Sequence, residues 1–344
     1  MQQTGIDNIE LISVSAIHIN NIVKICFEHT ERENALVVYD QRSPLARIIG
    51  QAYLNTLPRA RAIDFDTVAP DAVLAAIADL KPGDLVVLVQ STNFRLEAYR
   101  LRVELFKLNL KVIEHPHLER MSAEQIPVYI DALDYDPNYY RRVGPALKAH
   151  IDSARSTIID TGDDARLVYD SPLEPAKLNI GDYRDMTNTG GQFPIGEVFT
   201  EAQNLESVYG KLRVAVFGDT TFRVNRPPQP ITLTVERGRI VGVADSTPEF
   251  DLVLAQIRAE EGEVWLRELG FGMNRAFSAE RIVNDIGSYA RMCGVHMSLG
   301  AKHGQYTKPH IKRASARFHI DVFAATHLVS IDDRLVYQNG GWTV

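Results

Sequence analysis

Cysteine is scarce in this chain, and an N-terminal targeting pattern is missing. Cys26 and Cys293 are its two cysteines, and they form no Cys-x-x-Cys pair. Two cysteines are too few for a disulfide framework, so we expect a reducing compartment. The first residues carry neither a basic region nor a long apolar run, and we expect no stretch to reach a membrane-spanning length. We therefore expect a cytoplasmic protein without a membrane partner.

The chain also has fewer positive than negative charges and lacks the usual nucleotide-binding glycine motifs. The 344 residues include 37 Lys and Arg against 44 Asp and Glu, a net charge of −7. General binders of nucleic acids use basic surfaces to meet phosphates, so we expect no nucleic-acid partner. No Gly-x-Gly-x-x-Gly follows an expected strand, and no Gly-x-x-x-x-Gly-Lys occurs, so the usual nucleotide fingerprints are absent.

Residues 1–161 predict a doubly wound α/β domain. Short apolar runs alternate there with amphipathic segments, the pattern of a parallel sheet covered by helices. We expect strands at 35–40, 61–65, 85–89, 112–114 and 157–160, and helices at 44–54, 70–80, 95–108 and 137–154.

Residues 162–344 predict a β-rich α+β domain. Most of its segments read as strands between Gly, Pro and Asn turns, with one helix at about 249–266. Arg237-Gly238 separates two alternating runs and predicts a tight hairpin in which Gly238 takes a positive φ. The other expected strands are 165–169, 212–218, 295–299, 316–323 and 335–337.

His319 and Asp321 form the first candidate site. They lie two residues apart in Phe318–Val322, which reads as a strand, so both side chains should leave the same face. Neutral imidazole and carboxylate oxygen are both ligands for zinc-like ions, so the pair can share a cation. His-x-Asp also occurs by chance, and the alternative is a polar strand face.

Three further residues are candidates for chemistry. Glu197 lies between a Gly/Pro-rich approach and an apolar Val-Phe pair, and Glu268 lies at the expected end of a helix, before a glycine-punctuated segment. His296 is on an expected half-buried strand. The alternatives are a surface acid or one paired with a neighbour such as Arg267, and a hydrogen-bonded structural histidine.

The order of these motifs resembles the aminopeptidase T/aminopeptidase S family, also called thermophilic metalloproteases. The similar elements are Gly-Glu-Val-Phe-Thr, Glu-x-x-x-Gly followed by Asn, His-x-x-Leu-Gly, His-x-Asp and a tail with Asn-Gly-x-Trp. In this chain they are Glu197, Glu268 to Gly272 with Asn274, His296 to Gly300, His319 to Asp321, and Asn339 to Trp342. The resemblance covers roughly residues 188–344.

The resemblance implies a dinuclear metallohydrolase that cleaves the N-terminal residue from peptides. Two divalent ions (Zn, Co or Mn) would polarise the peptide carbonyl and activate a bridging water. Glu197 or Glu268 would be the general base, and His303 or Tyr306 would steady the tetrahedral intermediate. Family members pair, so a homodimer acting on a peptide or small-molecule substrate is expected. The implied metal ligands are Glu197, Glu268, His296, His319 and Asp321.

The sequence departs from the family at His303, where the family has Tyr; Tyr306 follows three residues later. An imidazole there can be an N–H donor or a sixth ligand. A second resemblance is to dihydroxypyridine ring-cleaving dioxygenases, which hold one Fe(II) with two histidines and an aspartate, but Glu268 stands where that group has a histidine. A third interpretation is a non-catalytic binder of peptides, with a substrate carboxylate docked by Lys308, Lys312, Arg313 and Arg317.

Overall fold

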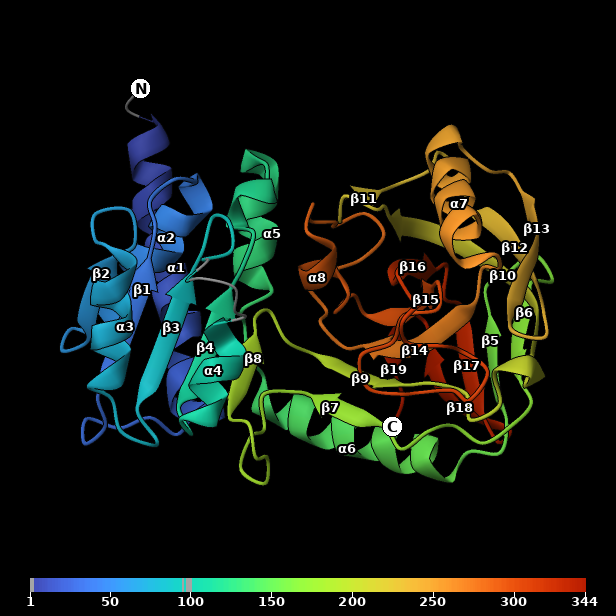
Figure 1. The fold of residues 1–344 in the computed structure, drawn as a ribbon, viewed down its shortest axis with the longest axis horizontal. Helices are drawn as coiled ribbons and strands as arrows, with labels where there is room; N and C mark the ends of the chain where they lie inside the picture. The colour runs from blue at the N-terminus through green and yellow to red at the C-terminus, as the bar shows by residue number, and fades with distance from the viewer. Residues whose placement is uncertain (1–2, 95, 97–100) are drawn as a thin grey trace. The chain divides into compact units, whose positions relative to one another are not determined.

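A five-stranded parallel sheet and a larger antiparallel sheet divide the chain between them (Figure 1). The computed structural model describes residues 3–94, 96 and 101–344. Two compact units result. The first comprises the chain up to Pro137 with Gly181–Ile195 and Val283–Ser288, and the second comprises Asn138–Ile180, Gly196–Ile282 and Tyr289–Val344.

The sheet of the first unit has the order β2-β1-β3-β4-β8, and all its neighbouring strands run parallel. Its centre, β3, has the sequence Leu-Val-Val-Leu-Val and is buried at every position, as expected for a strand covered on both faces. The strands are β1 (Ala35–Tyr39), β2 (Arg61–Asp64), β3 (Leu85–Val89), β4 (Lys111–His115) and β8 (Gly190–Gln192).

Helices cover both faces of this sheet. Val73 of α3 and Leu105 of α4 share a core with Leu36 and Leu88 on one face, while α2 approaches Tyr39 at the other. The arrangement confirms the doubly wound α/β class. The helices are α1 (Gln3–Asn21), which continues into the π-helical turn η1 (Ile22–Cys26), α2 (Pro44–Thr56), α3 (Pro70–Ala78), α4 (Leu101–Lys107), α5 (Ile126–Asp131) and the 3₁₀ turns η2 (Leu118–Arg120) and η3 (Ala123–Gln125).

The N-terminal helix corrects one expectation from the sequence. The segment Asn8–Cys26 is helical, with a mean hydropathy of 1.4, and is long and apolar enough to span a membrane by length and composition alone. In the structure 28% of this window is buried, with Ile19, Ile22 and Val23 inside and Ile17 exposed. The helix expected at 95–108 is described from Leu101 onward; residues 95 and 97–100 lie outside the described part.

The second unit is built on one 14-stranded sheet. The main path has the order β19-β18-β17-β5-β6-β10-β16-β15-β14-β9-β7, with antiparallel pairing, while β11 and β12 pair with β10 and β13 pairs with β12. Its strands are β5 (Thr157–Asp160), β6 (Arg166–Tyr169), β7 (Lys177–Asn179), β9 (Glu197–Thr200), β10 (Val208–Gly218), β11 (Val224–Asn225), β12 (Ile231–Glu236), β13 (Arg239–Ala244), β14 (Leu266–Gly272), β15 (Gly294–Leu299), β16 (Ile320–Ala324), β17 (Leu328–Ile331), β18 (Arg334–Gln338) and β19 (Gly341–Trp342).

Few helices accompany this β-rich sheet, as the sequence predicts. The hairpin between β12 and β13 is confirmed, with φ of 49° at Arg237 and 70° at Gly238. The remaining helical segments are α6 (Pro137–Ser153), α7 (Pro248–Glu261), α8 (Ile286–Tyr289) and the 3₁₀ turn η4 (Leu205–Ser207).

Two assignments from the sequence are wrong. The strand Thr157–Asp160 does not close the parallel sheet; it pairs antiparallel with β6 and β17, and β8 takes that place. The helix expected to run to residue 266 ends at Glu261, because Gly262 adopts a φ of 81° and stops it. Glu268 therefore lies on a strand, not at the end of a helix.

Candidate metal centre

Four neighbouring strands of the second unit position the candidate residues. In the antiparallel register, Gly272 of β14 lies opposite Glu197 of β9, and Gly270 lies opposite His296 of β15. On the other side of β15, Ser298 lies opposite Asp321 of β16. The strands therefore bring together side chains that are more than 120 residues apart in the chain.

Two local features of β14 shape the space between these side chains. The β14–β15 register shifts between Leu266 and Leu269, and such a bulge redirects the side chain of Glu268. Gly270 leaves room for an imidazole, since a Cβ at this position would lie 2.0 Å from Cε1 of His296. His296 is buried on a strand that is buried throughout, so the half-buried strand expected there is wrong.

Glu268 is the carboxylate that three imidazoles approach. Its Oε2 lies 3.1 Å from Nε2 of His303, and its Oε1 lies 3.6 Å from Nε2 of His296 and 3.9 Å from Nε2 of His319. The other two carboxylates of the site, Glu197 and Asp321, each approach one of these rings. Glu197 Oε1 lies 3.2 Å from His296 Nε2, and Asp321 Oδ1 lies 3.1 Å from His319 Nε2.

Several of these close atoms are not hydrogen-bonded to one another. Within the described part of the chain, both ring nitrogens of His296, Nε2 of His303 and Oδ1 of Asp321 are buried without a hydrogen-bond partner of acceptable geometry. A buried polar atom without a hydrogen-bond partner destabilises the fold unless another group, such as a bound ion, contacts it. Imidazole and carboxylate atoms that converge without bonding one another fit ligands of a divalent ion.

The ligand atoms form two triads that share Glu268. The first triad is Glu197, Glu268 and His296, and the second is Glu268, His319 and Asp321. In each triad the ligand atoms lie within 4.8 Å of one another. All five metal ligands expected from the sequence are thus brought together in groups that fit divalent ions.

The carboxylates strongly perturb the histidines of the triads. Burial on its own would lower the pKa of His296, but Glu197 and Glu268 raise it to about 10. Burial likewise opposes the charge on His319, but Glu268 and Asp321 raise its pKa to about 9. Burial also works against the ionised form of Glu268, but His319 and the other two imidazoles hold its pKa well below the ordinary value.

Backbone contacts fix different tautomers for His319 and His303. Nδ1 of His319 lies 3.1 Å from the carbonyl oxygen of Lys302, to which it donates, so Nε2 of the neutral ring keeps its lone pair for a ligand. Nδ1 of His303 instead accepts the backbone N–H groups of Gln305 and Tyr306. Neutral His303 therefore carries its proton on Nε2, the atom that lies 3.1 Å from Glu268 Oε2.

The structure does not bring the Tyr306 hydroxyl into this cluster. That hydroxyl donates to the carbonyl oxygen of Pro175 over 2.7 Å, and burial raises its pKa to about 12. Lys308 does not line an open basic surface either. It is 5% exposed, and its Nζ lies 2.6 Å from Glu174 Oε1 and 3.3 Å from Glu201 Oε2, so the expectation that it docks a substrate carboxylate is wrong.

Arg267 pairs with Glu201, not with its chain neighbour Glu268. Its Nη2 donates to Glu201 Oε2 over 3.0 Å, while further N–H groups donate to the carbonyl oxygens of Ala301 and Tyr306. Arg267 and Glu201 are both buried, and this pair anchors the segment that carries His303. No local sequence pattern indicates that Arg267 and Glu201 pair.

Arg291 is the site residue that the sequence reasoning missed. Its Nη1 lies 2.9 Å from Glu197 Oε2, and its side chain is 13% exposed. Its position just before the strand that carries His296 is the signal that could have identified it, because a residue there reaches the same sheet edge. A permanently charged guanidinium thus touches the first triad.

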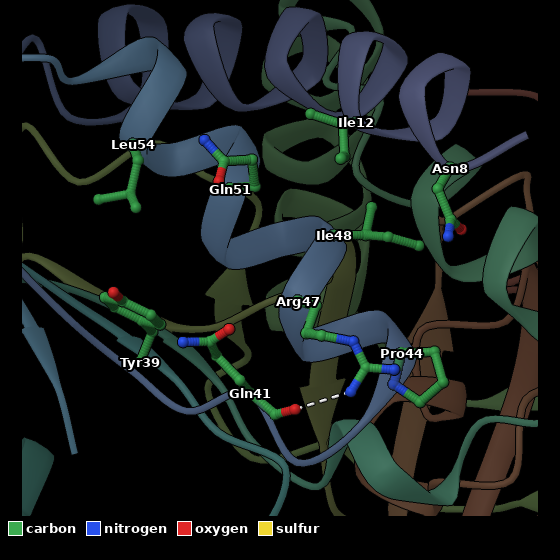
Figure 2. A pocket seen from close by; sticks show the side chains of 9 residues that line it. All are labelled: Asn8, Ile12, Tyr39, Gln41, Pro44, Arg47, Ile48, Gln51 and Leu54. Carbon is green, nitrogen blue, oxygen red and sulfur yellow. Dashed lines mark hydrogen bonds between the residues drawn. The ribbon is translucent and has the colours of Figure 1, made fainter. Parts of the chain in front are cut away.

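A separate cavity lies in the first unit. Figure 2 shows it between α1, α2 and the end of β1, with a volume of about 330 Å³. Arg47 lies at the edge of this cavity and donates from Nη1 to the carbonyl oxygen of Gln41 over 2.7 Å (Figure 2). The nine described lining residues include no histidine, cysteine or carboxylate, so they do not fit a metal: Asn8, Ile12, Tyr39, Gln41, Pro44, Arg47, Ile48, Gln51 and Leu54.

Known proteins resemble this chain in fold. No protein-family model and no curated protein sequence matches it. The solved structure of 2,5-dihydroxypyridine dioxygenase from Pseudomonas putida KT2440 matches with a TM-score of 0.64 at 17% identity, covering 98% of each chain. Wild-type AmpT from Thermus thermophilus matches with a TM-score of 0.58 at 12% identity, covering 96% of this chain and 99% of that one. Both similarities extend over nearly the whole chain, and at these identities they show the fold.

Proposed function

We propose that this protein is a metal-dependent hydrolase of the aminopeptidase type, which removes the N-terminal residue of peptides with the help of two divalent ions. The observation that carries the proposal is the pair of ligand triads joined at Glu268. Two ions bridged by one carboxylate are the arrangement that dinuclear hydrolases use. The fold similarity to AmpT supports it.

In this proposal Glu197, Glu268, His296, His319 and Asp321 hold the ions. When bound, such ions would supply polarisation of the scissile carbonyl and a water of lowered pKa. Glu197 or Glu268 would accept a proton from that water, since both carboxylates belong to the first triad.

His303 is the residue that we assign to the developing oxyanion. Its side chain is 1% exposed, and its backbone-fixed tautomer presents an N–H on the cluster side. A preorganised donor in a dry site stabilises charge that appears in the transition state. Tyr306, whose hydroxyl is engaged by Pro175, is assigned to support the ring of His303, with ring centroids 4.9 Å apart.

The first experiment combines metal content with hydrolysis. The purified chain is incubated with Zn(II), Co(II), Mn(II) or Fe(II), freed of excess metal, analysed for bound elements, and assayed on a panel of aminoacyl p-nitroanilides. We expect close to two ions per chain and release of p-nitroaniline. Glu268→Gln should lose both, whereas Glu260→Gln, the same change at an exposed position of α7, should lose neither. A chain that binds two ions but cleaves no aminoacyl bond would contradict the peptidase assignment.

A second candidate function is ring cleavage by a single Fe(II). It is favoured by the fold similarity to the dihydroxypyridine dioxygenase and by His296, His319 and Asp321, which supply two imidazoles and one carboxylate. Glu268 argues against it, because it adds a second carboxylate among these imidazoles. One equivalent selective for iron, with oxygen consumption on a dihydroxypyridine, would favour this function over the hydrolase.

A further inference from the structure

The two triads differ in the charge that faces them. Arg291 places a guanidinium against Glu197, the outer ligand of the first triad, and the charge of an arginine cannot be removed by deprotonation. The carboxylate is thereby already neutralised, and a cation entering beside it meets a positive neighbour. Among the described residues, Asp321 of the second triad has no such arginine or lysine within ion-pair distance.

The two triads also differ in how their histidines are held. His319 donates from Nδ1 to the carbonyl oxygen of Lys302, and a metal-ligating histidine held in this way has its ring orientation and tautomer fixed. His296 has no hydrogen-bond partner of acceptable geometry at either nitrogen within the described chain. The ring of His319 is therefore already held in the orientation and tautomer that bind an ion, whereas the ring of His296 is not.

Access to solvent points in the same direction. The side chain of His296 is 1% exposed and that of Glu197 is 6% exposed, whereas His319 is 29% exposed. A hydrated ion reaches the second triad with less loss of its water shell, and removing water from a charge is costly in a buried position.

We infer that the two metal positions are unequal: the first divalent ion binds at Glu268, His319 and Asp321, and Arg291 weakens the position at Glu197, Glu268 and His296. The inference rests on the proposed metal function and deepens it. Arg291 contacts Oε2 of Glu197, while Oε1 faces His296, so an ion at the first triad binds beside a guanidinium and the one-ion form is a distinct state. The weaker position should have at least ~10-fold lower affinity, since one unit of positive charge at close range has an effect of this order.

The test is a titration of the metal-free full chain with Co(II), followed by calorimetry and by the visible absorption of the bound ion. We expect two steps, with the second at least ~10-fold weaker. Arg291→Met should strengthen the second step and bring it to within about threefold of the first. Arg291→Lys, which keeps the charge, should keep the steps apart.

Two ligand variants identify the steps without relying on Arg291. Glu197→Gln should remove the weak step and leave the tight one, and Asp321→Asn should weaken the tight step. Two equal steps in the unmodified chain would overturn the inference and leave the hydrolase intact. The same holds if Arg291→Met folds and leaves both steps unchanged, or if Asp321→Asn affects the weak step. A chain that binds no Co(II) would overturn the proposed function together with the inference.

Discussion

Loading the metal centre should release about two protons from His296 and His319. A ligating imidazole must be neutral, yet in the metal-free chain the carboxylates raise the pKa of His296 to about 10 and that of His319 to about 9. At pH 7.5 both rings are therefore almost fully protonated. Each ion displaces roughly one proton, because each triad contains one histidine.

The sign of the pH dependence follows from these values. Both pKa values are raised above 6.5, so the charged imidazoles stabilise the metal-free fold below about pH 6.5, and this stabilisation is lost as the pH rises through 9 and 10. Protons compete with the ion, so the affinity of each position should rise by about tenfold per pH unit between pH 6.5 and 8.5.

Calorimetry in several buffers measures the proton count. The observed enthalpy of Co(II) binding, plotted against the ionisation enthalpy of PIPES, MOPS and HEPES, gives the number of protons released as its slope. We expect a slope near two at full loading and near one in His319→Gln. A slope near zero, or an affinity that does not change between pH 6.5 and 8.5, would refute the reasoning, because the imidazoles would then not be the ligands.

Three further predictions concern residues that pack or pair in the interior of each unit. Gly270→Ala should push the His296 ring aside and remove one Co(II) step from the titration, whereas Gly341→Ala, whose methyl meets no atom within 4 Å, should change nothing. His115 is buried with a pKa lowered to about 3 by desolvation, so about 2 kcal/mol of stability should be lost from pH 7.5 to pH 5, and His115→Gln should flatten that loss in urea unfolding. Arg267→Met removes the bidentate partner of buried Glu201 and leaves it only Lys308, so it should cost about 3 kcal/mol of unfolding free energy in the same assay.

Local sequence patterns predicted much of the fold. Apolar strands such as Leu85–Val89 and the Arg237-Gly238 hairpin are encoded by neighbours in the chain, and both are present. The fifth strand of the parallel sheet could not be found in this way. Gly190–Gln192 has three residues and no apolar run, so its place beside β4 depends on tertiary pairing.

In the site, too, contacts between near neighbours in the chain could be predicted, whereas contacts between distant residues could not. The strand expected at 316–323 begins only at Ile320, so His319 precedes it, although its Nε2 lies 3.1 Å from Asp321 Oδ1 as the pairing predicted. The contact of Arg291 with Glu197 and the pairing of Arg267 with Glu201 join residues at least 66 positions apart. Composition cannot specify such partners, because an arginine beside an acid in sequence need not pair with it.

Strand β8 comes late in the chain, which affects how the parallel sheet assembles during translation. Its residues leave the ribosome after the other four strands of the parallel sheet and after α6, so β4 keeps an open edge during much of translation. An unpaired edge invites pairing with another chain. We expect nascent or truncated chains that end before Gly190 to aggregate or to need a chaperone. Pairing of Gly190–Gln192 with β4 therefore protects the sheet edge as the chain folds.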